Sequence, residues 1–101
     1  MSTDWDRALA LEQQDEIERA VEILRTQTGD AAPYWQSQAS YLFQLRAERL
    51  WNAGRRDEAR AAAKESIAWA RQYASGATSG GEGAALSYQA DCIERQLAKY
   101  L

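Results

Sequence analysis

The chain has 101 residues, of which 46% are hydrophobic and 27% are charged, and its formal net charge is −3. These values are typical of one globular domain with a single modest core, so we expect residues 1–101 to form one domain. No stretch approaches the ~18 consecutive apolar residues of a membrane-spanning helix. The acidic, amphipathic N-terminus is unlike a signal or transit peptide. Because Cys92 is the only cysteine, no intramolecular disulfide can form, and we expect a cytoplasmic protein without a membrane partner.

The composition favours helix along the whole chain. There are twenty alanines, which have the highest helix propensity, and a single proline. No window alternates polar and apolar residues for long enough to predict a strand. The ten arginines against two lysines, together with the alanines, are typical of bacterial proteins from GC-rich genomes. The sequence therefore predicts an all-α fold, and the pattern below divides it into four antiparallel helices.

The first helix is expected over residues 4–28. Thr3 is a suitable N-cap, Asp4 and Asp6 fall in the positively polarised first turn, and Gly29 supplies a left-handed stop. One face of this helix carries an apolar stripe at spacings of three and four residues: Trp5, Leu9, Ile17, Ala20, Val21 and Leu24.

The second and third helices form a tight hairpin. The second is expected over residues 33–53, starting at Pro33 and stopping at Gly54. The third is expected over residues 57–75, with two acidic residues in its first turn. Its stripe consists of small side chains that allow a neighbouring helix to approach closely: Ala59, Ala63, Ile67, Ala70 and Ala74.

The fourth helix is expected over residues 83–101, after a flexible loop at residues 75–83. The loop sequence "SGATSGGEG" is rich in glycine and hydroxyl residues. It lacks the lysine that a phosphate-binding loop requires after its last glycine. The helix that follows repeats the apolar stripe with Leu86, Ala90, Ile93, Leu97 and Leu101.

Charge is distributed unevenly along the chain. Residues 1–30 carry a net charge of −5, residues 31–75 carry +3 and residues 76–101 carry −1. We expect the acidic first helix to lie beside the basic hairpin, so that the two partly neutralise each other. Nucleic-acid binding is disfavoured by the net negative charge and by the absence of a reading motif. A cluster of arginines keeps it as a minor alternative: Arg46, Arg49, Arg55, Arg56 and Arg60.

The turn "AGRRDEA" (residues 53–59) resembles the turn of a tetratricopeptide repeat, in which glycine ends the first helix and Asp-Glu-Ala opens the second. The resemblance covers a single repeat, from Ser40 to about Tyr73. It places Phe43, Ala47 and Leu50 at the large aromatic, small and large apolar positions of the first helix. On the second helix, Ala63 falls where a larger apolar residue is usual and Ser66 where a small one is usual. The sequence departs from the family pattern at Arg46, Ala63 and Arg71.

The resemblance implies a central hairpin that is flanked by the N-terminal and C-terminal helices, because one repeat cannot bury both of its faces. A plain antiparallel four-helix bundle fits the same stripes and is the alternative.

The resemblance also implies a binding face on the inner side of the second helix. In that family this face binds peptides, and the matching residues are Tyr41, Gln44, Glu48, Trp51 and Arg55. Spacings of three and four place them on one stripe, and tyrosine and tryptophan are common hot-spot residues. The alternative is that Tyr41 and Trp51 pack against the first or fourth helix, as aromatic residues at helical spacing commonly do.

Residues suited to catalysis are scarce. The chain has no histidine, so the commonest general base and metal ligand is missing. Cys92 lies beside the apolar stripe of the fourth helix and is expected to be a partly buried, inert thiol. The acidic residues at 15, 16, 18 and 22 spread around the first helix, which indicates a solvated face. We expect no enzyme, no cofactor and no metal site.

These observations predict a small cytosolic protein-binding module that holds a single partner protein, in the style of an immunity protein, an antitoxin or a secretion chaperone. The alternative is a structural subunit that satisfies its apolar stripes by self-association as a helical homodimer.

Overall fold

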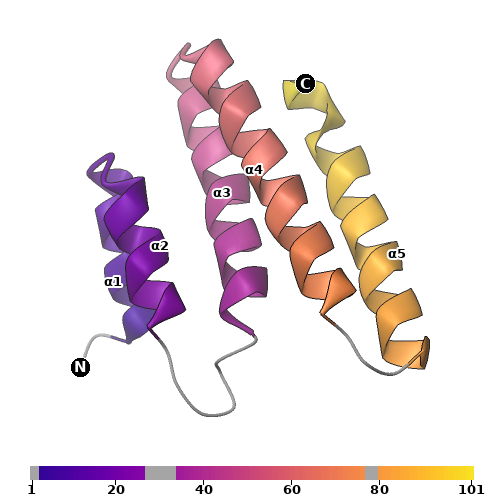
Figure 1. Ribbon diagram of the computed structural model, residues 1–101. Helices are drawn as coiled ribbons and strands as arrows, with labels where there is room; N and C mark the ends of the chain where they lie inside the picture. Colours follow the sequence, from indigo (N-terminus) through magenta and orange to yellow (C-terminus); the bar gives the residue numbers. More distant parts are fainter. Residues whose placement is uncertain (1–2, 27–33, 77–79) are drawn as a thin grey trace.

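The computed structural model describes residues 3–26, 34–76 and 80–101, which form five α-helices and one short 3₁₀ helix (Figure 1). The elements in chain order are α1 (Asp4–Gln13), α2 (Ile17–Arg25), α3 (Trp35–Asn52), α4 (Arg56–Ser75), α5 (Gly80–Leu97) and the 3₁₀ helix η2 (Ala98–Tyr100). The predicted all-α class is confirmed, whereas the prediction of four helices is wrong.

The helices are arranged as two hairpins followed by a single helix. In Figure 1, α1 and α2 form the first hairpin, α3 and α4 form the second, and α5 lies on the far side of α4. The first hairpin packs on the second through contacts of α1 and α2 with α3. Neighbouring elements in the sequence are therefore neighbours in space.

The predicted single helix over residues 4–28 is interrupted, because the chain turns back after Gln13 and α2 starts at Ile17. The start of α1 is as expected, since the Thr3 hydroxyl accepts a hydrogen bond from the Asp6 N–H at 3.1 Å and the Asp6 carboxylate accepts one from the Thr3 N–H. The predicted stop at Gly29 and the predicted start at Pro33 lie outside the described residues.

Both hairpins use the same turn. After the first helix of each hairpin comes one residue with positive φ, Asp15 (φ 62°) or Gly54 (φ 81°). The carbonyl of Leu11 accepts a hydrogen bond at 2.9 Å from the residue after Asp15, and the carbonyl of Leu50 accepts one at 2.9 Å from the residue after Gly54. This is the Schellman pattern, and it confirms the predicted left-handed stop at Gly54.

Buried alanines accompany the two turns at matching positions. Ala8 precedes Asp15 by the same number of residues as Ala47 precedes Gly54, and both alanines are fully buried. Ala20 and Ala59 stand at matching positions after the turns and are also fully buried. Small side chains there let the two helices of each hairpin approach closely.

The bounds of the last two helices differ slightly from those expected. α4 begins one residue early, at Arg56, and ends at Ser75 as predicted. α5 begins at Gly80, so part of the expected loop over residues 75–83 is helical, and residues 77–79 are outside the described part. Helix propensity is a weak preference that tertiary context overrides, and this is how a glycine-rich stretch can open a helix. The last residues form η2 instead of continuing α5.

The core consists of two apolar clusters that meet at α3. One cluster joins α1 and α2 to α3: Ala8, Ala20, Leu24, Ala39 and Leu42. The other joins α3 to α4 and the C-terminal end: Phe43, Ala47, Leu50, Ala59, Ala62, Ala63, Leu97 and Tyr100. Between them, Ser40 and Ser66 each donate a hydroxyl hydrogen bond to the other's carbonyl, at 2.8 and 2.7 Å. This reciprocal pair satisfies two buried hydroxyls and fixes α3 against α4.

A cluster of ion pairs attaches the turn between α1 and α2, called the first turn below, to the second hairpin. Glu12, whose side chain is only 2% exposed, accepts from Arg46 at 3.2 Å and from Arg49 at 2.6 Å. Asp15 pairs with Arg46, Arg49 and Arg55 at 3.2, 2.8 and 3.3 Å. The expected neutralisation between the acidic N-terminal segment and the basic hairpin is thus confirmed, at the turn that the sequence did not predict.

The arginines around Asp15 change its acidity. Their hydrogen bonds, first that of Arg49 and then that of Arg55, lower the pKa of the Asp15 carboxyl from its ordinary value of 3.8 to about 2. Arg55 also lowers the pKa of the Glu58 carboxyl, with which it forms a further ion pair.

Replacing Gly54 by alanine should lower the free energy of unfolding by about 1 kcal/mol, because an L-residue resists the left-handed conformation. An added Cβ would meet nothing within 4 Å, so the effect isolates the backbone conformation. Gly76→Ala is the matched control, since Gly76 has a helical φ and an added Cβ would make only ordinary contacts. Urea denaturation measures both, and equal midpoints for the two variants would contradict the left-handed stop.

Acid should weaken the attachment of the first turn. Because the folded-state pKa of Asp15 is lowered, its contribution to stability is complete above the ordinary value of 3.8 and is lost as the pH falls through about 2. The urea midpoint of the parent should therefore fall more steeply over this range than that of Asp15→Asn, whose side chain tolerates the left-handed region. Glu48→Gln, at an exposed position without an ion pair in the described chain, should keep the parental slope. A parental slope in Asp15→Asn would show that this carboxylate does not anchor the turn.

Candidate functional site

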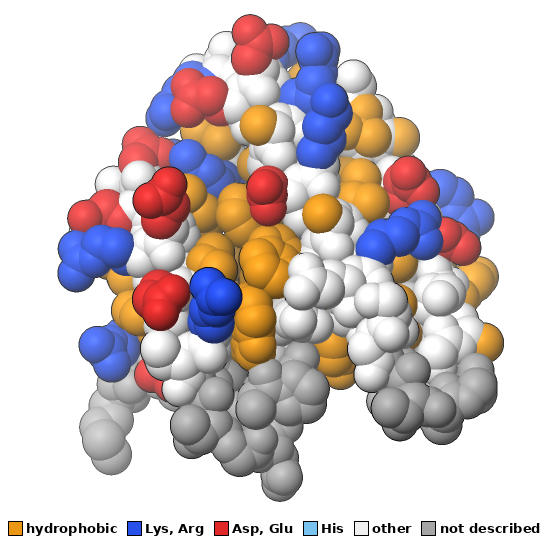
Figure 2. Space-filling view, in the orientation of Figure 1, with side chains coloured by type: hydrophobic (Ala, Val, Ile, Leu, Met, Phe, Trp, Pro, Cys, Tyr) orange, Lys and Arg blue, Asp and Glu red, His pale blue; other side chains and the backbone are white. Residues whose placement is uncertain are grey.

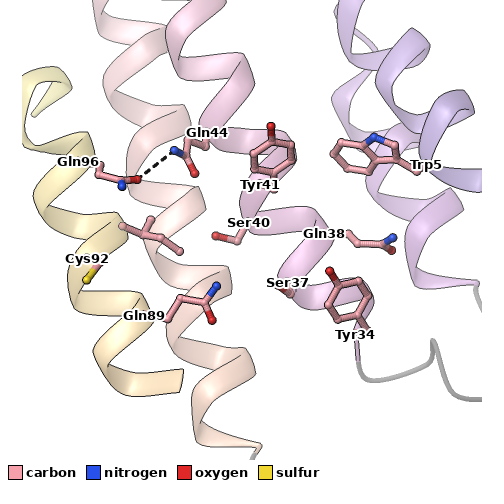
Figure 3. A pocket seen from close by; sticks show the side chains of 11 residues that line it. Trp5, Tyr34, Ser37, Gln38, Ser40, Tyr41, Gln44, Gln89, Cys92 and Gln96 are labelled. Carbon is pink, nitrogen blue, oxygen red and sulfur yellow. Dashed lines mark hydrogen bonds between the residues drawn. The ribbon is translucent and has the colours of Figure 1, made fainter. Parts of the chain in front are cut away.

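A groove of about 580 Å³ runs along α3, with α1 on one side and α5 on the other (Figure 3). Its size falls within the range of about 300–1,000 Å³ that is common for ligand sites. The residues that line it are Trp5, Tyr34, Ser37, Gln38, Ser40, Tyr41, Gln44, Gln89, Cys92, Ile93 and Gln96.

The floor of the groove is one face of α3 together with the residue before it. Tyr34, Gln38 and Tyr41 follow one another at helical spacings of four and three, so they share this face. Tyr41 is 52% exposed and Tyr34 is 50% exposed, so both rings are accessible to solvent. The Ser40 hydroxyl is already hydrogen-bonded to Ser66, so this residue contributes only to the shape of the groove.

The walls come from the helices on either side. The Trp5 ring of α1 packs against the Tyr41 ring at a tilt of 34°, with 5.6 Å between the ring centroids. On the α5 side, the Gln44 side-chain amide donates to the Gln96 Oε1 at 3.4 Å and joins floor to wall, as Figure 3 shows. Cys92 is half-buried on this wall, and Arg95 donates a hydrogen bond to its Sγ at 3.3 Å.

The lining is uncharged but polar. Among the described residues that line the groove there is no lysine, arginine, aspartate or glutamate, whereas four are glutamines. The Oε1 atom of Gln38 is buried and has no hydrogen-bond partner within the part of the chain that the structure describes. A buried acceptor without a donor is unfavourable, so a ligand N–H placed there would be stabilised.

The structure divides the five residues that the sequence grouped as a binding stripe. Tyr41 and Gln44 line the groove, and Glu48 is exposed at a smaller hollow just beyond it, which Gln44 and Gln96 also line. The other two side chains face the protein itself.

Trp51 and Arg55 are engaged in intramolecular contacts. The Trp51 ring is half-buried, lies edge-on to Tyr100 at 5.3 Å and carries the Arg56 guanidinium 4.2 Å above it. Arg55 forms ion pairs with Asp15 and Glu58. Trp51 therefore contacts the C-terminal end, which is the packing that the alternative describes for it.

Three of the five arginines that kept nucleic-acid binding open are paired with carboxylates. Arg46, Arg49 and Arg55 are held by the carboxylates of the first turn, and Arg56 lies over an aromatic ring. Guanidinium groups that are already paired have little to offer to a phosphate backbone.

Neither wall of the groove is predicted by the sequence pattern. Trp5 falls on the expected apolar stripe of the first helix, and the α5 residues Gln89, Cys92 and Gln96 belong to no predicted group. Their spacings of three and four were a readable signal of one face, adjacent to the apolar stripe of the same helix. The sequence does not indicate, however, that this face of α5 lies opposite α3.

Within residues 3–26, 34–76 and 80–101, no group of three or more histidine, cysteine or acidic side chains is placed to hold a metal ion. None of the helices in these ranges is long and apolar enough to cross a membrane. Comparisons with protein-family models, with curated proteins and with solved structures find no significant match.

Truncation of Trp51 and of Tyr41 should distinguish a side chain of the core from a side chain of the groove by the loss of stability. Trp51→Ala should lower the free energy of unfolding by about 2 kcal/mol or more, because it removes a packed ring and leaves a cavity. Tyr41→Ala should lower it by less than about 1 kcal/mol, since its ring is half exposed and loses mainly one aromatic contact. Urea denaturation of both variants measures the difference, and a larger loss for Tyr41→Ala would mean that the groove face is part of the core.

Proposed function

We propose that this protein is a small binding module that holds one partner protein in the groove between α1, α3 and α5. The observation that carries this proposal is the groove itself. Two half-exposed tyrosines, one partly exposed tryptophan and several amides converge there from three helices. Tyrosine and tryptophan provide large contact areas at low entropic cost, and they dominate the energetics of many interfaces.

The arrangement of the helices supports the same proposal. The turn at Gly54 carries the resemblance to a tetratricopeptide repeat, and the turn at Asp15 has the same hydrogen bonds and the same flanking buried alanines. Under this proposal the chain contains two such hairpins in tandem, and α5 covers the second. The first helices of the two hairpins then line one continuous face with α5, which is the face that holds the groove.

The biological style that fits a module of this size is an immunity protein, an antitoxin or a secretion chaperone acting in the cytoplasm. Each of these holds one partner without carrying out chemistry, and the scarcity of residues suited to catalysis is consistent with that role. The fold alone does not choose among them.

Self-association is the second candidate function, and two surface features favour it. Tyr88 on α5 is 65% exposed and Leu101 at the C-terminal end is 46% exposed. On the face seen in Figure 2, hydrophobic side chains also gather between α2 and α4. A helical homodimer would cover such surfaces through a symmetric interface.

Tyr41→Ala should weaken partner binding by about 2 kcal/mol, or about thirtyfold, as expected for a truncated aromatic hot spot. The partner is obtained by affinity capture from lysate of the source cells, and its affinity for parent and variants is then measured by calorimetry. Tyr88→Ala is the matched control, because it removes the same side chain from an exposed site that does not line the groove.

Equal affinities of the parent and Tyr41→Ala would contradict the groove as the binding site. Size-exclusion chromatography with light scattering decides the second candidate. A tight dimer that Tyr88→Ala dissociates would favour self-association, whereas a monomer at micromolar concentration would leave the groove as the interaction surface.

A further inference from the structure

We propose that a second surface, on the face opposite the groove, binds an amphipathic helix of a partner protein whose apolar stripe is flanked by lysine or arginine. This surface is a furrow between α2 and α4, with α3 as its floor (Figure 1). None of the residues that form it lines the groove. The inference therefore goes beyond the proposed function and does not depend on it.

The furrow exists because α2 and α4 each pack on α3 but hardly on each other. Along its floor, Trp35, Ala39 and Phe43 follow one another on α3 at helical spacings of four, so they share one face of that helix. The groove lies on the other side of α3, because α1 and α5 exchange left and right between Figure 1 and Figure 3. The two surfaces can therefore be occupied independently.

The furrow is apolar and partly exposed. Ile17 and Val21 of α2 and Trp69 of α4 pack against the core clusters, yet each keeps part of its surface accessible to solvent. Trp69 meets Trp35 of the floor edge-on, with 5.0 Å between the ring centroids. Figure 2 shows the hydrophobic side chains that gather here. Partly exposed tryptophans beside aliphatic side chains are the composition of an interface hot spot.

An apolar furrow favours a helix as its occupant. Indole rings and aliphatic side chains offer few hydrogen bonds to a peptide backbone, so an extended segment would lose water from its N–H and C=O groups without replacement. A helix satisfies these groups internally, and an amphipathic helix in an apolar groove is a common mode of recognition. The α4 wall also permits close approach, because Ala61 and Ala68 are small and exposed. A hollow beside Ala61 and Phe43 continues the furrow and can receive an apolar side chain.

The charges beside the furrow determine the sign of the partner. Glu18 on the α2 wall and Glu65 on the α4 wall are exposed, and neither forms an ion pair within the described chain. The arginines nearest to the furrow are already held in ion pairs: Arg25, Arg46 and Arg55. The carboxylates that remain for a partner are thus one on each wall, and lysine or arginine on both sides of an apolar stripe would complement them.

The same two glutamates disfavour a second copy of this chain as the occupant. A twofold axis through the furrow would bring the same surface of both copies together, and with it their unpaired glutamates. Like charges that meet at an interface destabilise it. A partner with cations would instead gain ion pairs from Glu18 and Glu65. Self-association, the second candidate function, then depends on the α5 side of the molecule, where Tyr88 is exposed.

Three synthetic peptides of about 20 residues, a length at which an isolated helix can form, test this inference on the whole protein. The first has leucine at helical spacing with lysine on both sides of the stripe. The second has glutamate in place of lysine, and the third has the composition of the first in an order that forms no stripe. None contains tryptophan, so binding is followed by the fluorescence of the protein, in which Trp35 and Trp69 lie in the furrow. We expect the first peptide to bind at least about tenfold more tightly than the other two.

Charge reversal on one wall should reverse this preference. Glu65→Lys should weaken the lysine peptide at least about tenfold and strengthen the glutamate peptide, because the unpaired carboxylate becomes a cation. Glu48→Lys is the matched control, since Glu48 is also exposed but lies at the hollow beside the groove. It changes the net charge by the same amount and should change the Kd of either peptide less than about twofold.

A steric block tests the helix itself. Ala61→Arg places a long cationic side chain on the α4 wall and should weaken the lysine peptide at least about tenfold. Ala85→Arg, at an exposed position on α5, is the control and should bind as the parent does. Both positions are exposed, so both variants should keep the parental urea midpoint.

Other outcomes would overturn the inference. Equal losses in Glu65→Lys and Glu48→Lys would show a general attraction between opposite net charges, and equal binding of the third peptide would remove the helical stripe. Equal binding of the lysine and glutamate peptides, or no binding of the lysine peptide, would exclude a basic helix as the occupant. Light scattering that finds a parental dimer, and a monomer for Ala61→Arg, would show that a second copy covers the furrow.

Discussion

The carboxylate of Glu12, buried between Arg46 and Arg49, fixes the position of the first hairpin in this protein. A buried carboxylate is tolerated only when its charge is paired and its oxygens are hydrogen-bonded, so α1 cannot slide along α3 without losing both. Asp15 strengthens the same attachment from the turn, where its own backbone is held in a left-handed conformation. Because Trp5 belongs to α1, this attachment also sets the distance between Trp5 and Tyr41 across the groove.

α3 serves two purposes because its faces differ in chemistry. Apolar residues such as Leu42 and Leu50 are fully buried in the two core clusters and hold the neighbouring hairpin and helix in place. On another face, amides and tyrosines are left at the groove. The reciprocal Ser40–Ser66 hydrogen bonds lie between these faces and keep α4 close behind the groove floor. A rigid helix with a well-packed core can thus present polar side chains in fixed positions, which reduces the entropy lost on binding.

The separation of charge from the groove is the feature most relevant to function. The charged side chains on the first turn and on the start of α4 neutralise one another in a network, while the groove is lined by neutral amides and aromatic rings. A site of this kind discriminates through hydrogen-bond geometry and shape instead of long-range attraction.

The sequence by itself determined the helical class, the cap at Thr3, the left-handed stop at Gly54 and the pairing of an acidic with a basic segment. These features follow from local chemistry: helix propensity, a hydroxyl at the N-terminus of a helix, a residue without a Cβ, and net charge. It also placed Tyr41 and Gln44 on one face, since helical spacing is a local property. Only the tertiary structure decided the rest. The break at Asp15 has no glycine or proline to announce it, and three arginines about 30 to 40 residues further along the chain surround that aspartate. Trp51 and Tyr41 look alike in the sequence, yet one meets Tyr100 and the other meets Trp5 because of where the C-terminal end and α1 pack. The groove itself exists only because α1 and α5, from opposite ends of the chain, flank the same face of α3, and no local pattern encodes such a meeting of distant segments.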